Sequence, residues 1–504
     1  MGARSLRTGK QYLASLKEDG RQVFLDGEPV KDVAGHPAFR RAAESIAALY
    51  DAAADPANRD EMTYPSPAGG NPVHRAWQVP KTADDLAAKR RFHERWAEAS
   101  FGLMGRTPDH VASFFCGYAA KPSVFAAHGR QWADNVVRFY EYARDNHVYL
   151  SYAIVLLQID RSKPPHRQAD PTLHAGVVKE RDDGVLLRGG QQLATAGALS
   201  DMLHLSCIQP LGPGDENYAI SVALPMNAPG LKLYQRRAFS LQATSLYDYP
   251  LSSRFDETDS LVVLDDVFVP WERVFIHRNI ELCRDQWWRT PSHAYGNFQA
   301  QVRYATKLRF LMGIAKRMVE MTGSDALPPV MVQLGELAAL AQLVESGLEA
   351  HQALATVDDE GVLWPSRASL YSVMALQSEM HGRILEGMRE LAGAAFITLP
   401  SSVKDYGNPE VARDLERYIA TPGVDPHERV ALMRLAWEML GTEFAGRQQQ
   451  YEKFYGGASF LVKQNMYRSY DFKRAKALVE RALEPAREDL KSRLGTRASG
   501  KPAS

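Results

Sequence analysis

The sequence predicts an α+β protein that is mainly α, with helices at both ends of the chain and strands in the middle. Before about residue 145 and after about residue 290, apolar residues recur at the spacing of amphipathic helices. Between these parts, short strand-length runs follow one another without a regular helix between them. That pattern indicates an antiparallel barrel or sandwich rather than a βαβ domain. We therefore predict three domains, over residues 1–145, 146–280 and 281–504.

The first domain is expected to be helical. Segments 36–54 and 84–104 place their apolar residues on one helical face. The intervening loop, 55–74, is rich in Pro, Gly and Asn, which are turn formers.

The central domain is expected to hold the strands. The predicted strands are an apolar run at 149–158, a hairpin over 173–195 that turns at Asp183-Gly184, and strands at 218–226 and 260–276. Pro270 should end a strand or lie at an edge. Neither GxGxxG nor GxxxxGK[ST] occurs, so any flavin would bind without a Rossmann half-domain.

The third domain is predicted to be a helical bundle with a disordered tail of about ten residues. Asp425-Pro426-His427-Glu428 has the cap, proline and acid of a helix start. Two sets of apolar residues each keep one helical face, and the second alternates steps of four and three, the spacing of a bundle seam. They are Val302, Ala305, Leu308, Met312, Ala315 and Val319, and Val330, Leu334, Leu337, Ala341, Val344 and Leu348.

Composition excludes several classes of function. Lys+Arg and Asp+Glu both number 60, which argues against a nucleic-acid or anionic-membrane partner. Cys116, Cys207 and Cys283 are far apart, so we expect neither a metal site nor a disulfide, in a reducing cytoplasmic setting. We also expect no signal peptide and no membrane span, since no apolar run is long enough.

Four polar segments are candidates for chemistry. They are Gly105–His110, Gln158–Arg161 after the run that contains Tyr152, Asp248–Glu257, and Gly441–Arg447. Each also has a structural interpretation: Arg106 as a helix-end ion pair, Tyr152 as a core tyrosine, or Asp160-Arg161 as a surface pair of little energetic weight. By themselves they suggest a buried polar site between the strands and the bundle.

Together these segments resemble a known family. The runs TGKQYLASLKEDGRQVFLDGEPVKDVAGHPAF, MGRTPDH, QIDR, DYPLSSRFDE, DDVFVPWE, ITLPSSVKD and GTEFAGRQQQYE are similar, in order, to the 4-hydroxyphenylacetate 3-hydroxylase oxygenase components. The resemblance spans about residues 7–470. Related members act on chlorophenols, the pyoverdine chromophore and carrier-tethered tyrosine derivatives. The resemblance implies the acyl-CoA dehydrogenase fold, with N-terminal helices, a central antiparallel β barrel and a C-terminal four-helix bundle, as a homotetramer.

The implied activity is a two-component, FADH2-dependent monooxygenation. A separate NAD(P)H:flavin reductase supplies FADH2, and the oxygenase uses O2 to hydroxylate a phenol ortho to its OH through a flavin C4a-hydroperoxide. The substrate is expected to resemble 4-hydroxyphenylacetate or tyrosine, free or bound to a carrier protein. A catechol is the product.

The resemblance also implies a site. Arg106, His110 and Tyr152 match the catalytic and substrate positions, to which Cys207 and Ile208 are added. The flavin positions map onto Gln158, Ile159, Asp160, Arg161, Thr195, Phe444, Ala445, Gly446 and Arg447. Arg161 and Arg447 suit the pyrophosphate and Thr195 the flavin N5. Family members typically carry Tyr at position 110 and His at position 152, so the exchange puts the substrate, not the reaction, in question.

Two alternatives remain on the same fold. One is an acyl-CoA dehydrogenase, which would purify yellow with tight FAD. The other is a 4-hydroxybutyryl-CoA dehydratase, whose iron–sulfur cluster needs three cysteines and a histidine, a set that the unclustered cysteines here do not suggest. A non-catalytic scaffold is a third interpretation, without a positive feature.

Overall fold

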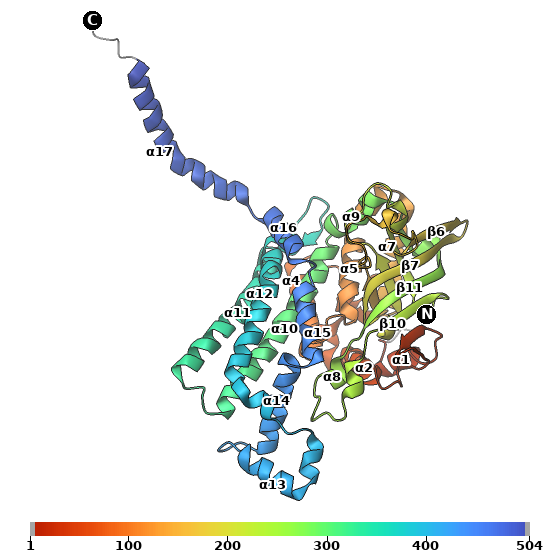
Figure 1. Cartoon of the computed structure of the whole chain (residues 1–504). Coiled ribbons are helices and arrows are strands. Elements are labelled where there is room, and N and C mark those ends of the chain that lie inside the picture. The colour runs from red at the N-terminus through yellow and green to blue at the C-terminus, as the bar shows by residue number, and fades with distance from the viewer. Residues whose placement is uncertain (1–5, 499–504) are drawn as a thin grey trace.

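The computed structural model describes residues 6–498 and follows the predicted order of helices, strands and helices (Figure 1). The N-terminal part contains α1 (Gly9–Ser15), α2 (Arg40–Ala54), α3 (Arg59–Met62), α4 (Ala83–Glu98), α5 (Pro108–Ala120), α6 (Ser123–Ala126) and α7 (Arg130–Asp145). Helices α2 and α4 confirm two predicted segments.

Four short strands in this part were not predicted. They are β1 (Gln22–Leu25), β2 (Glu28–Val30), β3 (Thr63–Pro65) and β4 (Pro72–His74). Strand β1 pairs with a strand some 200 residues later, Gln22 opposite Lys232. Three or four residues are too few to show a period, and the partner lies far away in sequence, so no local pattern announces them.

The central part forms two sheets. A six-stranded sheet has the order β2-β1-β10-β11-β7-β6, and a four-stranded sheet has the order β12-β9-β8-β5. The bounds are β5 (Leu150–Ala153), β6 (Gly176–Arg181), β7 (Gly184–Thr195), β8 (Met202–Ser206), β9 (Ile220–Pro225), β10 (Leu231–Gln235), β11 (Asp259–Pro270) and β12 (Val274–His277). The predicted hairpin is β6–β7, and Pro270 ends β11 as expected.

The expectation of a purely antiparallel barrel needs a correction. Pairs β1–β10 and β5–β8 are parallel. In the central part the hydrogen-bonded ladders leave two sheets, which backbone bonds between Val155 and Gln192 join at one corner. Whether two strands pair in parallel depends on how the chain connects them. The alternation of side chains along a strand is the same in both cases and does not predict it.

The C-terminal part is built on long helices (Figure 1). Helices α10 (Ser292–Met321), α11 (Pro328–Ala353) and α12 (Arg367–Ala392) contact one another, and α14 (Pro426–Leu440) and α15 (Glu443–Phe454) complete the bundle. Asp425 caps α14 and Pro426 is its first residue, as predicted. Shorter elements are α8 (Ser252–Phe255), α9 (Ile280–Trp288), β13 (Thr356–Val357), β14 (Leu363–Trp364), α13 (Pro409–Tyr418) and α16 (Ser459–Ser469).

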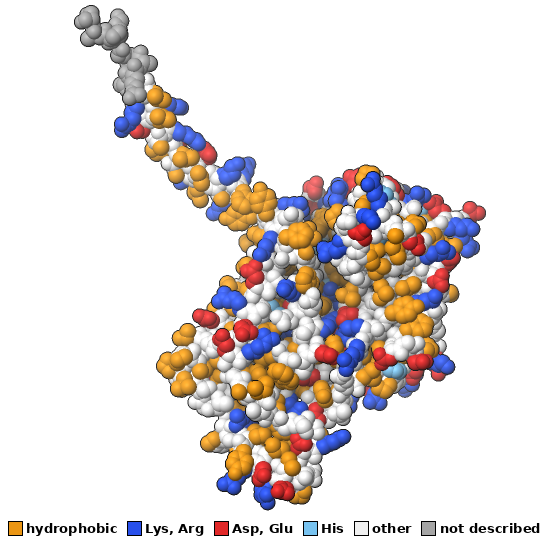
Figure 2. Space-filling model, viewed as in Figure 1, with side chains coloured by type: hydrophobic (Ala, Val, Ile, Leu, Met, Phe, Trp, Pro, Cys, Tyr) orange, Lys and Arg blue, Asp and Glu red, His pale blue; other side chains and the backbone are white. Residues whose placement is uncertain are grey.

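The last helix, α17 (Phe472–Ala498), projects away from the body (Figure 1). Hydrophobic side chains are interspersed with charged ones along it (Figure 2). Leu478, Leu483, Leu490 and Leu494 are all exposed. Part of the predicted disordered tail, 495–498, continues this helix, and the remaining residues 499–504 lie outside the described chain. No helix within residues 6–498 is long and apolar enough to cross a membrane.

Candidate active site

Arg106 lies in the turn that enters α5. The helix begins at Pro108, so Arg106 precedes it and does not share a helix face with His110. The two residues nevertheless meet at one place. The guanidinium carbon of Arg106 lies 5.0 Å from the centre of the Tyr152 ring, and the His110 ring centre lies 5.5 Å from it. The turn, rather than a shared helix face, brings them together.

Three tyrosines surround the Arg106 guanidinium. Nη2 donates to the Tyr152 hydroxyl at 2.8 Å and Nη1 to the Tyr451 hydroxyl at 2.5 Å. The Tyr455 ring centre is 5.0 Å away. Burial alone would lower the pKa of Arg106, but the surrounding phenols and Glu257 raise it above its usual range. A buried, permanently charged guanidinium therefore already binds phenol oxygens in this site.

Arg447 is held by carboxylates. Its Nε and Nη2 donate to the two oxygens of Asp259 at 3.0 and 2.8 Å, and Nη1 donates to Glu257 at 3.1 Å. Glu257 also accepts from the backbone N–H of Arg106 at 2.6 Å, so one carboxylate joins both arginines. A flavin pyrophosphate would have to compete with these bonds. The geometry therefore favours Arg447 as part of the wall and not as the phosphate clamp we expected.

Thr195 ends β7 against the same cluster. Its hydroxyl donates to Asp259 at 2.6 Å, and Asp259 also accepts from Arg236 at 2.7 Å. Burial alone would raise the pKa of Asp259, but Arg447 and Arg236 hold it far below the usual range. The ionised carboxylate can only accept hydrogen bonds, so the Thr195 hydroxyl is the donor of this one. The Thr195 oxygen then offers its lone pairs to any other group.

The Asp248–Glu257 segment fastens the bundle to the strands. Asp248 accepts from the backbone N–H of Val403 at 3.0 Å and pairs with Arg434 at 3.3 Å. Ser252 donates to Glu438 of α14. Because the same segment ends in Glu257, it links these anchors to Arg106 and Arg447. Its density of polar groups is thus explained by contacts that position the site.

His110 is fully buried on the first turn of α5. Its Nδ1 lies 2.8 Å from Oε1 of Gln299, whereas Nε2 has no hydrogen-bond partner within residues 6–498. Burial, followed by the charge of Arg106, lowers the pKa of His110 well below its usual range. The imidazole is therefore neutral at physiological pH.

The Gln158–Arg161 segment lies apart from this cluster. All four residues are exposed in the loop after β5. Asp160 accepts from the hydroxyl of Ser162 at 2.6 Å and pairs with Lys163 at 2.9 Å. None of these contacts reaches the cluster around Arg106. A flavin bound by both would have to span the distance between the segment and that cluster.

Residues 444–446 begin α15 beside the cluster. Phe444 and Ala445 are buried and Gly446 is exposed. Thr442 caps this helix by accepting from the backbone N–H of Ala445 at 3.2 Å. The cap fixes the helix start, and thereby the place of Arg447, the fifth residue of the helix.

Cys207 and Ile208 do not touch Arg106 directly. The Cys207 carbonyl accepts from Nε1 of Trp287 at 3.0 Å. Phe114 stands between Trp287 and Tyr152, with ring centres at 5.8 and 5.7 Å. The thiol of Cys207 is buried and Ile208 is half-buried. Their predicted contact with substrate is therefore, at most, indirect in this structure.

Sequence reasoning missed four members of the site: Tyr451, Tyr455, Gln299 and Asp259. A signal existed for the tyrosines, because Arg447, Tyr451 and Tyr455 follow one another at steps of four and share a face of α15. No comparable signal marks Gln299, which lies in α10 among many other buried residues.

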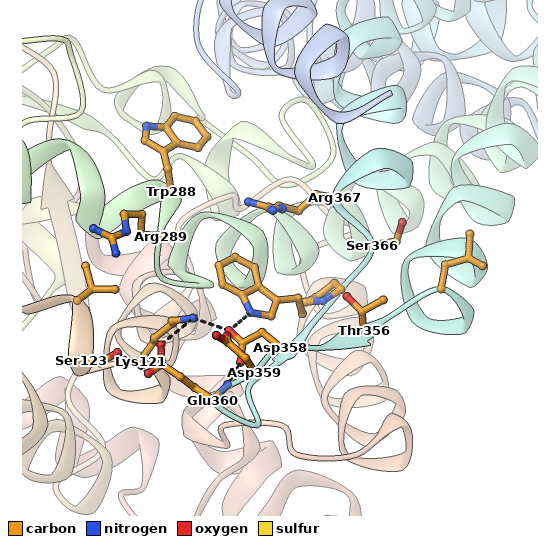
Figure 3. A pocket seen from close by; sticks show the side chains of 14 residues that line it. Lys121, Ser123, Trp288, Arg289, Thr356, Asp358, Asp359, Glu360, Ser366 and Arg367 are labelled. Atoms are coloured by element: carbon orange, nitrogen blue, oxygen red, sulfur yellow. Dashed lines mark hydrogen bonds and ion pairs between the residues drawn. The ribbon is translucent and has the colours of Figure 1, made fainter. Parts of the chain in front are cut away.

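A separate cavity of about 650 Å³ lies at the edge of the bundle (Figure 3). Trp288 and Arg289 line one side and Arg367 another, and Lys121 bridges Asp358 and Glu360 at 2.6 and 3.1 Å. None of the predicted site residues lines it. Its cationic and acidic side chains are balanced, so it indicates no particular ligand.

Comparison with known proteins agrees with the resemblance in the sequence. Models of the N-terminal and C-terminal parts of 4-hydroxyphenylacetate 3-hydroxylase match residues 8–276 and 283–484. The 4-hydroxyphenylacetate 3-monooxygenase oxygenase component of Thermus thermophilus is 34% identical, over 92% of this chain and 95% of its own. The Streptomyces globisporus (3S)-3-amino-3-(3-chloro-4-hydroxyphenyl)propanoyl-[peptidyl-carrier protein SgcC2] monooxygenase is also 34% identical, over 90% and 86%.

Solved structures agree as well. An oxygenase component of 4-hydroxyphenylacetate 3-monooxygenase complexed with FAD and 4-hydroxyphenylacetate is 33% identical, with TM-score 0.91, over 96% of this chain and 100% of that chain. An archaeal 4-hydroxybutyryl-CoA dehydratase shares the fold, with TM-score 0.84 at 22% identity. The predicted fold class and family are confirmed. The chain belongs to the 4-hydroxyphenylacetate 3-hydroxylase family.

Proposed function

We propose that this chain is the oxygenase component of a two-component monooxygenase that hydroxylates a phenol ortho to its OH. The observation that carries the proposal is the buried Arg106 guanidinium, which is already bonded to two phenol oxygens, those of Tyr152 and Tyr451. A separate reductase supplies FADH2. Relatives of this chain include oxygenase components of 4-hydroxyphenylacetate 3-monooxygenase, which supports the proposal.

The residues fit a reduced flavin. Reduced flavin carries a proton on N5, where oxidised flavin carries a lone pair. Thr195 uses its hydroxyl hydrogen in the hydrogen bond to Asp259, so its oxygen remains as an acceptor for an N–H group. The ring would lie beside Thr195, and the exposed Gln158, Ile159, Asp160 and Arg161 would hold the remainder against Phe444, Ala445, Gly446 and Arg447. When bound, reduced flavin together with O2 supplies the oxygen atom that is transferred.

Arg106 and His110 prepare the phenol. A free phenol has a pKa of about 10, and a neighbouring cation lowers it by about 1–3 units. The Arg106 guanidinium donates to the phenol oxygen, while the neutral His110 takes the phenol proton at Nε2. Negative charge on the oxygen enriches the ring at its ortho carbon, where the electrophilic oxygen adds.

Tyr152 and Tyr451 complete the oxygen-binding set. Burial raises the pKa of both tyrosines, although Arg106 opposes the shift, so both stay protonated. A protonated hydroxyl can donate to a bound phenolate while its own oxygen accepts from Arg106. Both tyrosines therefore act as positioning groups for the substrate oxygen, and neither competes with His110 as a base.

The substrate class rests on the relatives. Their names include 4-hydroxyphenylacetate, 4-nitrophenol and a carrier-bound chlorinated β-tyrosine derivative. We propose a 4-hydroxyphenylacetate-like or tyrosine-like phenol, either free or tethered to a carrier protein. The exchange of His and Tyr between positions 110 and 152 leaves this choice to experiment.

The decisive experiment is a panel of these phenols, with and without a carrier, given a flavin reductase, NADH and FAD. We expect a catechol, detected by a mass increase of one oxygen, and no NADH oxidation by the chain alone. Arg106→Ala is the matched negative control. Absence of any hydroxylated product, together with tightly bound yellow FAD and acyl-CoA oxidation, would favour the dehydrogenase alternative.

We further propose a cytoplasmic homotetramer. The three cysteines are buried and carry no disulfide, as in a reducing compartment. Helix α17 exposes the apolar side chains of Leu478, Leu483, Leu490 and Leu494, which a second copy of the chain would cover. Sedimentation at micromolar concentration tests the assembly, and a 56.2 kDa monomer would contradict it.

A further inference from the structure

A line of buried hydrogen bonds runs from Asp109 through Gln299 to His110. Nε2 of Gln299 donates to Oδ2 of Asp109 at 3.2 Å, and Oε1 of Gln299 lies 2.8 Å from Nδ1 of His110. All three side chains are buried. We propose that Asp109 and Gln299 fix the tautomer of His110, so that its proton sits on Nδ1 and its Nε2 lone pair faces the substrate.

Asp109 sets the direction of the line. Its Oδ1 accepts from the Thr107 hydroxyl at 2.5 Å, and its Oδ2 lies 2.7 Å from Nδ1 of His93. A carboxylate accepts hydrogen bonds and does not donate them. Only the NH2 end of the Gln299 amide can therefore face Asp109. The carbonyl end must then face His110.

The carbonyl of Gln299 in turn selects the proton position on His110. A carbonyl oxygen accepts only, so Nδ1 must carry a proton to bond with it. A neutral imidazole has one N–H, which leaves Nε2 with a lone pair. This nitrogen has no hydrogen-bond partner within residues 6–498, although it is buried. An unpartnered buried acceptor requires a donor, and a substrate phenol O–H is one.

The helix packing keeps the line in place. Helices α5 and α10 approach closely because Gly117 and Gly296 lack side chains. A Cβ atom on Gly117 would lie 2.2 Å from the backbone of Ser292, and one on Gly296 would lie 2.2 Å from the Phe114 ring. Asp109 and His110 are on α5, and Gln299 is on α10, one turn after Gly296. The close contact thus holds both ends of the line at hydrogen-bonding distance.

The consequence is a two-point recognition of the phenol group, and it rests on the proposed function. Arg106 donates to the phenol oxygen and Nε2 of His110 accepts the hydrogen bond of the phenol O–H. When the proton crosses to Nε2, the phenolate left beside the imidazolium offsets the burial and the Arg106 charge that keep the free imidazole neutral. With the opposite tautomer, both residues would present donors and the phenol could not release its proton to His110. Asp109 and Gln299 touch neither substrate nor flavin, so both are positioning residues.

The test exchanges the carboxylate and the amide. In Asp109→Asn the new amide can donate to Oε1 of Gln299, which lets the Gln299 amide turn and present its NH2 end to His110. We expect the proton of His110 to move from Nδ1 to Nε2. The double variant Asp109→Asn with Gln299→Glu restores an acceptor opposite Nδ1, and we expect the wild-type tautomer to return.

Two readouts follow the tautomer. Nitrogen-15 shifts of labelled histidine report it directly, with His110→Phe to assign the signal. Added 4-nitrophenol reports the consequence, because its ionised form absorbs visibly. We expect the ionised fraction to change several-fold in Asp109→Asn, because the donors and acceptors around the phenol oxygen change, and to return to the wild-type value in the double variant. Gln301→Leu, a buried amide on α10 that bonds to Gln377 instead, is the matched control and should change neither readout.

An unchanged tautomer in a folded Asp109→Asn protein would overturn the proposal, as would a double variant that folds but keeps the altered tautomer. If Asp109→Asn does not fold, Gln299→Leu takes its place and must give a mixture of tautomers. These spectra need neither flavin nor turnover. A wild-type tautomer as proposed without hydroxylation of any phenol would therefore refute the proposed function alone, and intact hydroxylation with an unaffected tautomer would refute this proposal alone.

Discussion

The junction between the strands and the bundle differs sharply from the outer segments that carry motifs of the same family. At the junction, the charged groups of Arg106, Arg447 and Asp259 all have hydrogen-bond partners within the same chain. In contrast, Gln158–Arg161 and α17 present charged and apolar groups to the outside. The difference separates two kinds of segment. In one kind, the polar groups find their partners within a single chain, and in the other they remain exposed and can bind flavin or another subunit.

Physical chemistry explains the separation. A buried charge without a partner costs several kcal/mol, so each junction residue must find its partner when the chain folds. An exposed ion pair contributes about 0–1 kcal/mol, so outer segments can keep groups for a ligand. Substitutions should therefore have large effects at the junction and small ones outside.

The largest effect is expected inside the bundle. Glu452 pairs with Arg303 at 2.5 Å and with Lys307 at 2.8 Å, and all three side chains are buried. Glu452→Ala leaves two unpaired buried cations and should destabilise the fold by about 3–5 kcal/mol. Urea unfolding measures this. Glu379→Ala removes an exposed partner of Lys463 and should leave the free energy of unfolding nearly unchanged. An equal loss of stability in the two variants would contradict the difference that we infer between the junction and the outer segments.

Arg106→Ala should have the largest effect on activity. Removing a preorganised charged donor lowers hydroxylation by about 100–1000-fold. Reduced flavin should still bind, since the Thr195 wall is intact, and the reducing equivalents should appear as H2O2. Arg106→Lys keeps the charge but loses the fork and should be intermediate. Measuring catechol against NADH consumed tests this, and unchanged coupling in Arg106→Ala would make the residue structural.

His110 should act without titrating near neutrality. Since burial holds its pKa well below the usual range, it remains the neutral base from pH ~6 to ~8. His110→Phe should slow oxygen transfer by about 100-fold, by the same factor across that window. Unfolded chains protonate this histidine below pH ~6.5, so the same shift makes the fold less stable as the pH falls further. A His110-dependent inflection near pH 6.5 in rapid kinetics would show that the site is wetter than its burial indicates.

Outside the junction, Arg161→Ala should be mild. Its exposed guanidinium contributes nothing to folding that urea could detect, and a single screened phosphate contact is worth up to about 1 kcal/mol. The affinity for reduced flavin should fall by a factor of a few, with unchanged coupling of the bound form. A loss of stability comparable to that of Glu452→Ala would place Arg161 with the interior residues instead.

Removal of α17 after residue 470 should affect catalysis least. The helix projects from the body, so its loss should leave the melting temperature of the subunit and the tyrosine set around Arg106 unchanged (Figure 1). We expect a smaller assembly by sedimentation, with hydroxylation retained at saturating reduced flavin. An unchanged tetramer would show that other surfaces hold the copies together.

The sequence by itself determined the order of helices and strands, the β6–β7 turn at Asp183-Gly184 and the start of α14 at Asp425. These signals are local, because periodicity, turn formers and caps act over a few residues. The order of its motifs also determined the family, and it singled out Arg106, His110 and Tyr152 as candidates for the site.

Only the tertiary structure decided which groups meet. It pairs β1 with β10 in parallel. It places Arg447 in hydrogen bonds with Asp259 and Glu257, where the sequence suggested a phosphate contact. It also places the NH2 end of the Gln299 amide against Asp109. Each contact joins residues that are far apart in the chain. Such contacts follow from the close packing of whole elements, where burial forces every polar group to find a partner, and no local pattern records which partner that is.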